Sequence, residues 1–130
     1  MDLRQYQGKF VLIQYWATSC EPCKADHSVI KDLYAKYGGL DFDVVGVNLD
    51  YSSDEALAYL KSNRLPWKQL YEPGGFDSRL ANEMGVITLP LMLLVDQQGS
   101  VVKSSIQSAE LESELKKRLN SKGTRTAKRK

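Results

Sequence analysis

Apolar positions along the chain fall into blocks that predict strands and helices in alternation. Residues 10–16 (FVLIQYW) form an almost unbroken apolar and aromatic run, which is typical of a buried strand. The apolar residues that follow recur at helical spacing: Ala25, Val29, Ile30, Leu33 and Tyr37. Because Gly38 and Gly39 then end the pattern, the sequence predicts a strand, a short turn and a helix in succession.

A second strand and helix follow in the same order. Residues 42–49 (FDVVGVNL) predict the strand, and Ser52 with Glu55 predicts a capping box for a helix that reaches about Asn63. Residues 67–71 predict a short strand and residues 77–84 a short helix. Repeated strand and helix units favour an α/β fold with parallel strand pairing.

The last third of the chain predicts a hairpin and a final helix. Two runs, residues 91–95 and 101–105, flank a turn that contains Gly99 and read as antiparallel strands. Leu111, Leu115 and Leu119 then share one helix face. We expect one domain over residues 1–120, followed by a basic, disordered tail over residues 121–130.

Composition and charge exclude some classes of function. With 42% hydrophobic and 26% charged residues in 130, the chain is typical of a globular domain, and its longest mainly apolar run is too short to span a membrane. Residues 116–130 carry eight of the 18 basic residues and no acidic one. They contain no aromatic residue for base stacking, so we expect a solvated tail and no nucleic-acid partner.

The candidate chemistry lies in Cys20-Glu21-Pro22-Cys23, where the first strand meets the first helix. At a helix N-terminus, free N–H groups and the helix dipole stabilise a thiolate. We therefore expect Cys20 to be the nucleophile that attacks a disulfide, and Cys23 to resolve the mixed disulfide by attacking Cys20. Glu21 adds a negative charge between the cysteines, which disfavours the thiolate and points toward a reducing couple.

Three other uses of the cysteines stay open at this point. A structural zinc site needs four ligands, whereas the chain offers two Cys and one His, so no metal is expected. Two inert buried cysteines are disfavoured by the strand-to-helix setting of the motif. A thiol peroxidase needs a peroxide pocket around one low-pKa cysteine, and no separate signal for such a pocket is evident.

The segment Trp16-Ala17-Thr18-Ser19-Cys20-Glu21-Pro22-Cys23-Lys24 resembles the active-site segment of the thioredoxin superfamily. Together with Gly8-Lys9, residues 44–48 (VVGVN) and residues 84–90 (MGVITLP), it is most similar to the TlpA/ResA-like extracytoplasmic thiol-disulfide oxidoreductases. The resemblance implies a three-layer α/β/α sandwich with a central mixed sheet. It also implies a periplasmic or otherwise extracytoplasmic location, for which the first six residues show no signal peptide.

The resemblance also implies site residues beyond the cysteines. Pro90 should form a cis-proline beside the cysteine pair, and the backbone of Leu89 should bind an extended substrate segment. Trp16 either packs beside the disulfide and contacts substrate or is a core residue. Without the resemblance, Pro90 would merely end a strand.

Asp26 is the predicted proton carrier of the site. It follows Cys23 by three residues and should point toward the sheet near the thiols, where the related proteins often carry Glu. An exposed acid in the first helical turn is the alternative. Gln14 stands where cytosolic thioredoxins have a buried Asp, and His27 is expected to be exposed and without a role.

The sequence thus predicts an enzyme that reduces protein disulfides through its own Cys20–Cys23 disulfide, without a metal or organic cofactor. A disulfide-containing protein would be the substrate, another dithiol protein the electron donor, and the enzyme a monomer. The alternatives are a thiol peroxidase-like enzyme and a non-catalytic module that binds a metal or a substrate.

Overall fold

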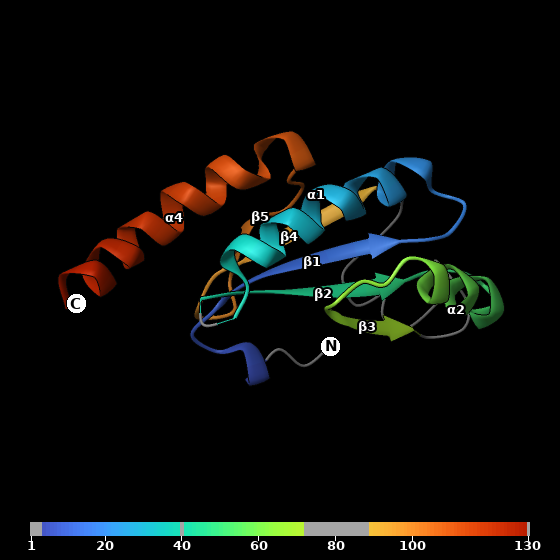
Figure 1. The fold of residues 1–130 in the computed structure, drawn as a ribbon, viewed down its shortest axis with the longest axis horizontal. Coiled ribbons are helices and arrows are strands. Elements are labelled where there is room, and N and C mark those ends of the chain that lie inside the picture. Colours follow the sequence, from blue (N-terminus) through green and yellow to red (C-terminus); the bar gives the residue numbers. More distant parts are fainter. Residues whose placement is uncertain (1–3, 40, 72–88, 130) are drawn as a thin grey trace.

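The structure, a computed structural model, describes residues 4–39, 41–71 and 89–129, and of residues 120–129 the backbone alone. A short 3₁₀ turn, η1 (Arg4–Tyr6), precedes the first strand. The described strands and helices run in this order (Figure 1): β1 (Phe10–Trp16), α1 (Glu21–Tyr37), β2 (Phe42–Asn48), α2 (Ser53–Ser62), β3 (Lys68–Tyr71), β4 (Leu91–Val95), β5 (Val101–Lys103) and α4 (Ser108–Arg129). The predicted strands and hairpin are therefore confirmed, whereas the helix predicted for residues 77–84 lies outside the described residues.

One mixed sheet forms the centre of the fold, with the strand order β3-β2-β1-β4-β5. The two strand and helix units pair in parallel, β1 with β2 and β2 with β3. The hairpin strands β4 and β5 are antiparallel to each other, and β4 is antiparallel to β1. Strand β1, which leads into the cysteines, is thus central and has neighbours on both sides.

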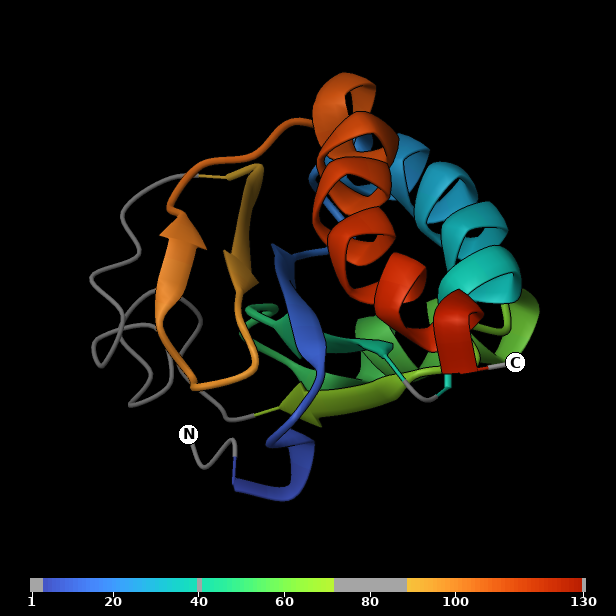
Figure 2. The same cartoon turned by 90° about the vertical axis from the view of Figure 1, so that its left-hand side faces the viewer.

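The two faces of the sheet carry separate apolar clusters. Phe10 and Leu12 of β1 pack with Ile30 and Leu33 of α1 and with the leucines of α4. Val11, Ile13 and Tyr15 point to the opposite face, because successive side chains of a strand alternate. Figure 2 shows α1 and α4 side by side over the first face. Among the described residues no long helix covers the second face, so the third layer of the sandwich stays a prediction there.

Local signals explain where the helices begin and end. Pro22 lies in the first turn of α1, where its missing N–H is not needed. Gly38 ends α1, and a Cβ added there would meet the carbonyl oxygen of Tyr34. The side chain of Ser52 caps α2 by accepting a hydrogen bond from the N–H of Asp54, so Ser52 is confirmed as the cap, whereas the part of Glu55 in a capping box stays a prediction.

The buried face of α1 differs from the predicted one. Val29 is 38% exposed and Ala25 is also exposed, whereas the buried residues are Cys23, His27, Ile30 and Leu33. The prediction that His27 is exposed was wrong. These four positions follow helical spacing from Cys23, so the cysteine that packs against β1 sets the buried face, and a polar residue is included because it has partners there.

Helix α4 confirms the predicted leucine face, since Leu111, Leu115 and Leu119 are all buried. Its backbone remains helical beyond Leu119 as far as Arg129. The division into a domain over residues 1–120 and a disordered tail stays a prediction. A search of the described residues finds no helix that is long and apolar enough to cross a membrane.

Candidate active site

The two cysteines form a disulfide at the start of α1. Their sulfur atoms are 2.04 Å apart and their Cα atoms 5.3 Å apart. Cys20 is the N-cap of α1, at the end of the short loop that follows β1. It is half-buried, whereas Cys23 has no exposed surface. A reactant from solvent therefore reaches the sulfur of Cys20 and not that of Cys23.

Hydrogen-bond partners distinguish the two sulfur atoms electrostatically. The backbone N–H of Cys23 donates to Sγ of Cys20 over 3.1 Å. After reduction, this donor and the N-terminus of α1 stabilise a thiolate on Cys20. The Sγ of Cys23 lies 3.8 Å from the carbonyl oxygen of Tyr15. This oxygen accepts a hydrogen bond from a protonated thiol, whereas its partial negative charge repels a thiolate. The surroundings thus favour a thiolate on Cys20 and a protonated thiol on Cys23.

The charge of Glu21 is partly compensated by a neighbouring cation. Nζ of Lys24 lies 3.1 Å from Oε2 of Glu21 and 5.6 Å above the centre of the Tyr59 ring. The Glu21 side chain is 81% exposed, so solvent screens this ion pair strongly. The unfavourable effect of Glu21 on a Cys20 thiolate is correspondingly weakened.

Asp26 borders a cavity of about 360 Å³ beside the cysteine loop. The cavity is lined by residues of α1, β4 and the segment before α4: Pro22, Asp26, Pro90, Leu91, Met92, Ser105, Ile106, Gln107 and Ser108. Burial raises the pKa of the Asp26 carboxyl above its ordinary value, and a hydrogen bond with Ser108 partly opposes that rise. Asp26 is therefore a half-buried group whose carboxyl stays protonated to a higher pH than that of an exposed aspartate.

The other predicted site residues differ in their access to this cavity. The Leu89–Pro90 peptide bond is cis, and Pro90 is exposed on the cavity wall next to Pro22. Leu89 is half-buried and packs against the apolar cluster on the second face of the sheet. The structure thus brings Pro90, Asp26 and the cysteine loop together.

Trp16 has no exposed surface and lies behind the site. Its indole N–H donates to Oε1 of Gln69 over 2.9 Å, and its ring contacts the rings of His27 and Tyr59. This burial favours the core alternative for Trp16, and its expected contact with substrate has no support from the geometry.

A buried carboxylate that sequence reasoning missed holds the loop before Cys20. Asp50, 7% exposed, accepts hydrogen bonds from the N–H and the hydroxyl of Thr18, with a shortest distance of 2.9 Å. It also accepts a bond of 2.8 Å from the side-chain amide of Asn48. The sequence held a signal for this site, since Asn48 ends β2 and Asp50 follows it, at the edge where the parallel strand β1 ends at the cysteine loop.

Sequence reasoning also missed a buried polar group of α1 that contacts α2. His27 is 3% exposed, and its two ring nitrogens lie 2.9 Å from Oε1 of Gln14 and 2.9 Å from the hydroxyl of Tyr59. Burial, with a smaller contribution from Lys31, lowers the pKa of His27 to about 4. Gln14 is buried as well and donates to the carbonyl oxygen of Cys23 over 3.1 Å.

Comparison with known proteins agrees with this geometry. Residues 8–101 match the family described as Thioredoxin-like. The chain is 28% identical over 120 residues to the thiol-disulfide oxidoreductase ResA of Bacillus thuringiensis subsp. konkukian, covering 90% of this chain and 68% of that protein. It is 26% identical over 103 residues to ResA of Bacillus subtilis, covering 79% of this chain and 56% of that one.

A solved structure gives the same result in three dimensions. The thiol-disulfide oxidoreductase from Bacteroides fragilis superposes with a TM-score of 0.78 at 25% identity, covering 88% of this chain and 84% of that one. The chain belongs to the thioredoxin-like family. Within that superfamily it is ResA-like, and its Cys20–Cys23 pair gives it the dithiol redox centre of an oxidoreductase.

Within the part of the chain that the structure describes, no three His, Cys, Asp or Glu side chains gather as a metal site. The redox-active group that is present is the Cys20–Cys23 disulfide itself. The expected lack of a cofactor stays a prediction.

Proposed function

We propose that this protein reduces disulfides in other proteins, with Cys20 as the attacking and Cys23 as the resolving cysteine. The observation that carries the proposal is the asymmetry of the disulfide. Cys20 is accessible and its sulfur accepts an N–H bond at a helix N-terminus, whereas Cys23 is fully buried. Such a pair attacks through one sulfur and closes through the other.

The reaction balances in two exchanges. The Cys20 thiolate attacks one sulfur of the substrate disulfide, a mixed disulfide forms, and the other substrate sulfur leaves as a thiolate. Cys23 loses its proton and attacks Sγ of Cys20, which releases the second substrate sulfur. Two electrons pass to the substrate, and the enzyme is left with the Cys20–Cys23 disulfide. A dithiol protein upstream would restore the reduced form by the same exchange in reverse.

Asp26 is proposed to accept the proton of Cys23. Its half-buried position one helical turn after Cys23, and its raised pKa, support a group that takes up and releases protons during exchange. The substrate segment is proposed to lie over the cavity beside Pro90, where the backbone of Leu89 offers hydrogen bonds to an extended chain.

Three further properties are proposed from family membership. The couple is a reductant rather than an oxidant, the enzyme acts outside the cytoplasm, and it is a monomer. The resemblance to ResA supports the first two.

The test is to trap the mixed disulfide in cells with Cys23→Ser. Because this variant cannot close the ring, we expect proteins covalently attached to Cys20 that dithiothreitol releases. Cys20→Ser is the matched control and should trap none. An equal yield of adducts from both variants, or consumption of peroxide by the wild-type enzyme at rates above its disulfide exchange, would contradict the proposal.

A further inference from the structure

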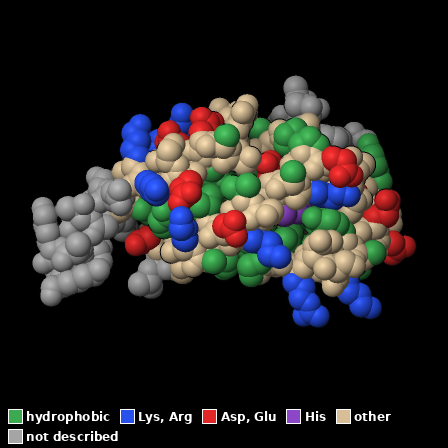
Figure 3. All heavy atoms as spheres, turned by 45° about the horizontal axis from the view of Figure 1, so that its top comes forward, with side chains coloured by type: hydrophobic (Ala, Val, Ile, Leu, Met, Phe, Trp, Pro, Cys, Tyr) green, Lys and Arg blue, Asp and Glu red, His purple; other side chains and the backbone are tan. Residues whose placement is uncertain are grey.

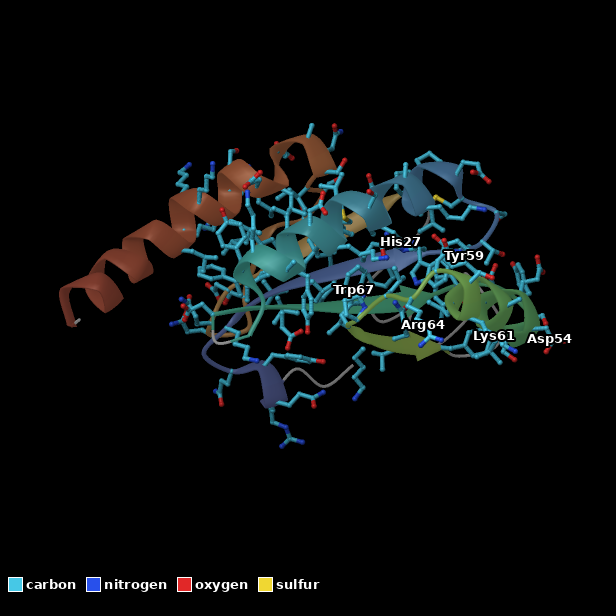
Figure 4. The ribbon with its side chains drawn as sticks, in the orientation of Figure 1. His27, Asp54, Tyr59, Lys61, Arg64 and Trp67 are labelled. Carbon is cyan, nitrogen blue, oxygen red and sulfur yellow. A yellow bond between two sulfur atoms is a disulfide. The ribbon has the colours of Figure 1, made fainter. Side chains whose placement is uncertain are left out.

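Three polar side chains form a continuous chain of hydrogen bonds beneath the disulfide. The hydroxyl of Tyr59 on α2 lies 2.9 Å from Nδ1 of His27, and Nε2 of His27 lies 2.9 Å from Oε1 of Gln14. Nε2 of Gln14 donates to the carbonyl oxygen of Cys23 over 3.1 Å. Figure 4 shows His27 and Tyr59 adjacent to each other between α1 and α2. The chain therefore connects α2 with the residue that carries the resolving sulfur.

The direction of each hydrogen bond follows from donor chemistry. The Cys23 carbonyl only accepts, so the amide group of Gln14 that faces it must be the NH₂ group. The amide oxygen of Gln14 then accepts from Nε2–H of His27, which leaves Nδ1 as the acceptor for the Tyr59 hydroxyl. A flipped Gln14 amide would place two acceptors against each other. A single tautomer of neutral His27 satisfies all three bonds.

The surroundings keep His27 neutral. The rings of Trp16 and Trp67 lie 4.9 Å and 6.4 Å from its ring, and its pKa of about 4 leaves it uncharged at neutral pH. A cavity of about 310 Å³ next to it is bordered by three charged side chains: Lys24, Lys31 and Asp32. Figure 3 shows the histidine as a small patch almost covered by its neighbours. The tautomer and its bonds thus persist under the conditions of disulfide exchange.

The Gln14 bond matters most when the disulfide is open. In the oxidised protein, the covalent bond to Cys20 itself holds Cys23 in place. In the mixed disulfide that bond is absent, and the side-chain bond from Gln14 of β1 to the Cys23 carbonyl still ties the first turn of α1 to the central strand. Ring closure then depends on how closely Cys23 Sγ stays within reach of Cys20 Sγ, since reactions between groups held together lose rate steeply when one is misplaced.

We propose that His27 is a positioning residue for the resolving step: by holding Gln14 against the Cys23 carbonyl, it keeps Cys23 poised to attack Cys20. This inference rests on the cysteine roles proposed above. The residues that would support the resolving cysteine then include Tyr59 of α2.

The test separates the two exchanges with oxidised glutathione as the probe. Reduced protein is mixed with it and quenched with acid, and the glutathione adduct on Cys20 is followed by mass spectrometry. For His27→Phe, which keeps an aromatic ring and loses both hydrogen bonds, we expect attack by Cys20 within about twofold of wild type and closure slowed about tenfold, so that the adduct accumulates. With the reverse step unchanged, this tenfold slower closure makes the equilibrium constant for disulfide formation tenfold smaller, which raises the reduction potential by about 30 mV.

Three variants distinguish positioning from general stability. His27→Gln keeps an N–H donor for Gln14 and should restore most of the closure rate. Tyr59→Phe removes only the bond to Nδ1 of His27 and should slow closure less than His27→Phe does. It also tests the hydrogen-bond network if His27→Phe does not fold. Ile30→Val, a core change on the same helix, should lower stability without slowing closure.

The outcomes are distinguishable from those of the proposed function. Wild-type closure in both His27→Phe and Tyr59→Phe, or equal slowing of attack and closure, would overturn the positioning role alone. If wild-type protein forms no adduct at Cys20, the cysteine roles fail and the inference fails with them.

Discussion

Asp26 and His27 are neighbours in sequence, but their side chains face different neighbours of α1. Asp26 borders the cavity beside Pro90, and His27 borders the one between α1 and α2. Burial raises the pKa of Asp26 and lowers that of His27, so it shifts each group toward its neutral form relative to the exposed side chain. At the residue scale, the environment therefore favours proton uptake by Asp26 and disfavours it for His27.

Asp26→Asn should change the pH dependence of stability. Because burial raises the pKa of Asp26 in the folded state, its contribution to stability is fully present below the pKa of the unfolded chain and is lost as the pH rises through the folded pKa. The variant does not undergo this loss, so its free energy of unfolding relative to wild type should increase as the pH rises from below the ordinary aspartate pKa through the raised folded pKa. Urea denaturation across this range measures it.

The same variant should lose part of its exchange activity, because the proposed proton acceptor of Cys23 is gone. Asp32→Asn is the control, since it removes an exposed carboxylate from the same helix. Unaltered pH dependence of both stability and exchange in Asp26→Asn would count against the role of Asp26.

At the scale of elements, the site depends on how β1, β2 and α1 meet. The two parallel strands end at the same edge of the sheet, where the loop after β1 carries Cys20 and the segment after β2 carries Asp50. Asp50 binds Thr18 across this edge. The position of the nucleophile is thus determined by two chain segments, one of which contains no cysteine.

Asp50→Ala should destabilise the protein and loosen the cysteine loop. It leaves the donors of half-buried Thr18 and buried Asn48 without their acceptor, which costs about 1–3 kcal/mol of the free energy of unfolding for an unsatisfied buried group. Asp54→Ala, on the exposed surface of α2 (Figure 4), should change stability by less than about 0.5 kcal/mol. Chemical denaturation of both variants checks the difference, and equal stabilities would contradict the role given to Asp50.

At the scale of the whole molecule, the fold is a central sheet with helices α1 and α4 over one face (Figure 2). Leu119 is buried against that face and belongs to the predicted domain. The basic residues beyond it belong to the predicted tail.

Removal of residues 121–130 should therefore leave the domain intact. We expect the thermal midpoint and the rate of disulfide exchange to stay close to those of the full chain, because the apolar contacts of Leu111, Leu115 and Leu119 are retained. Calorimetry and an exchange assay on both chains test this. Truncation before Leu119 is the positive control, and a large loss from removal of the tail alone would show that residues 121–130 belong to the domain.

The order of the strands and helices was predictable from the sequence, because it follows from local periodicity. Residues 10–16 and 42–49 predicted buried strands, and the leucines of residues 111–119 predicted a helix face, and the structure has all three. The cysteine motif was equally predictable from the sequence, since its chemistry depends on two cysteines separated by two residues at a strand-to-helix junction.

Tertiary structure alone decided which polar residues support that motif. His27 looked exposed because the apolar residues Ala25 and Val29 suggested another helix face, yet Gln14 and Tyr59 make its burial favourable. Asp50 looked like a loop residue until β1 and β2 brought it to Thr18. Burial of a polar group is favourable only when distant partners satisfy it, and those partners are defined by the packing of the whole chain rather than by its local pattern.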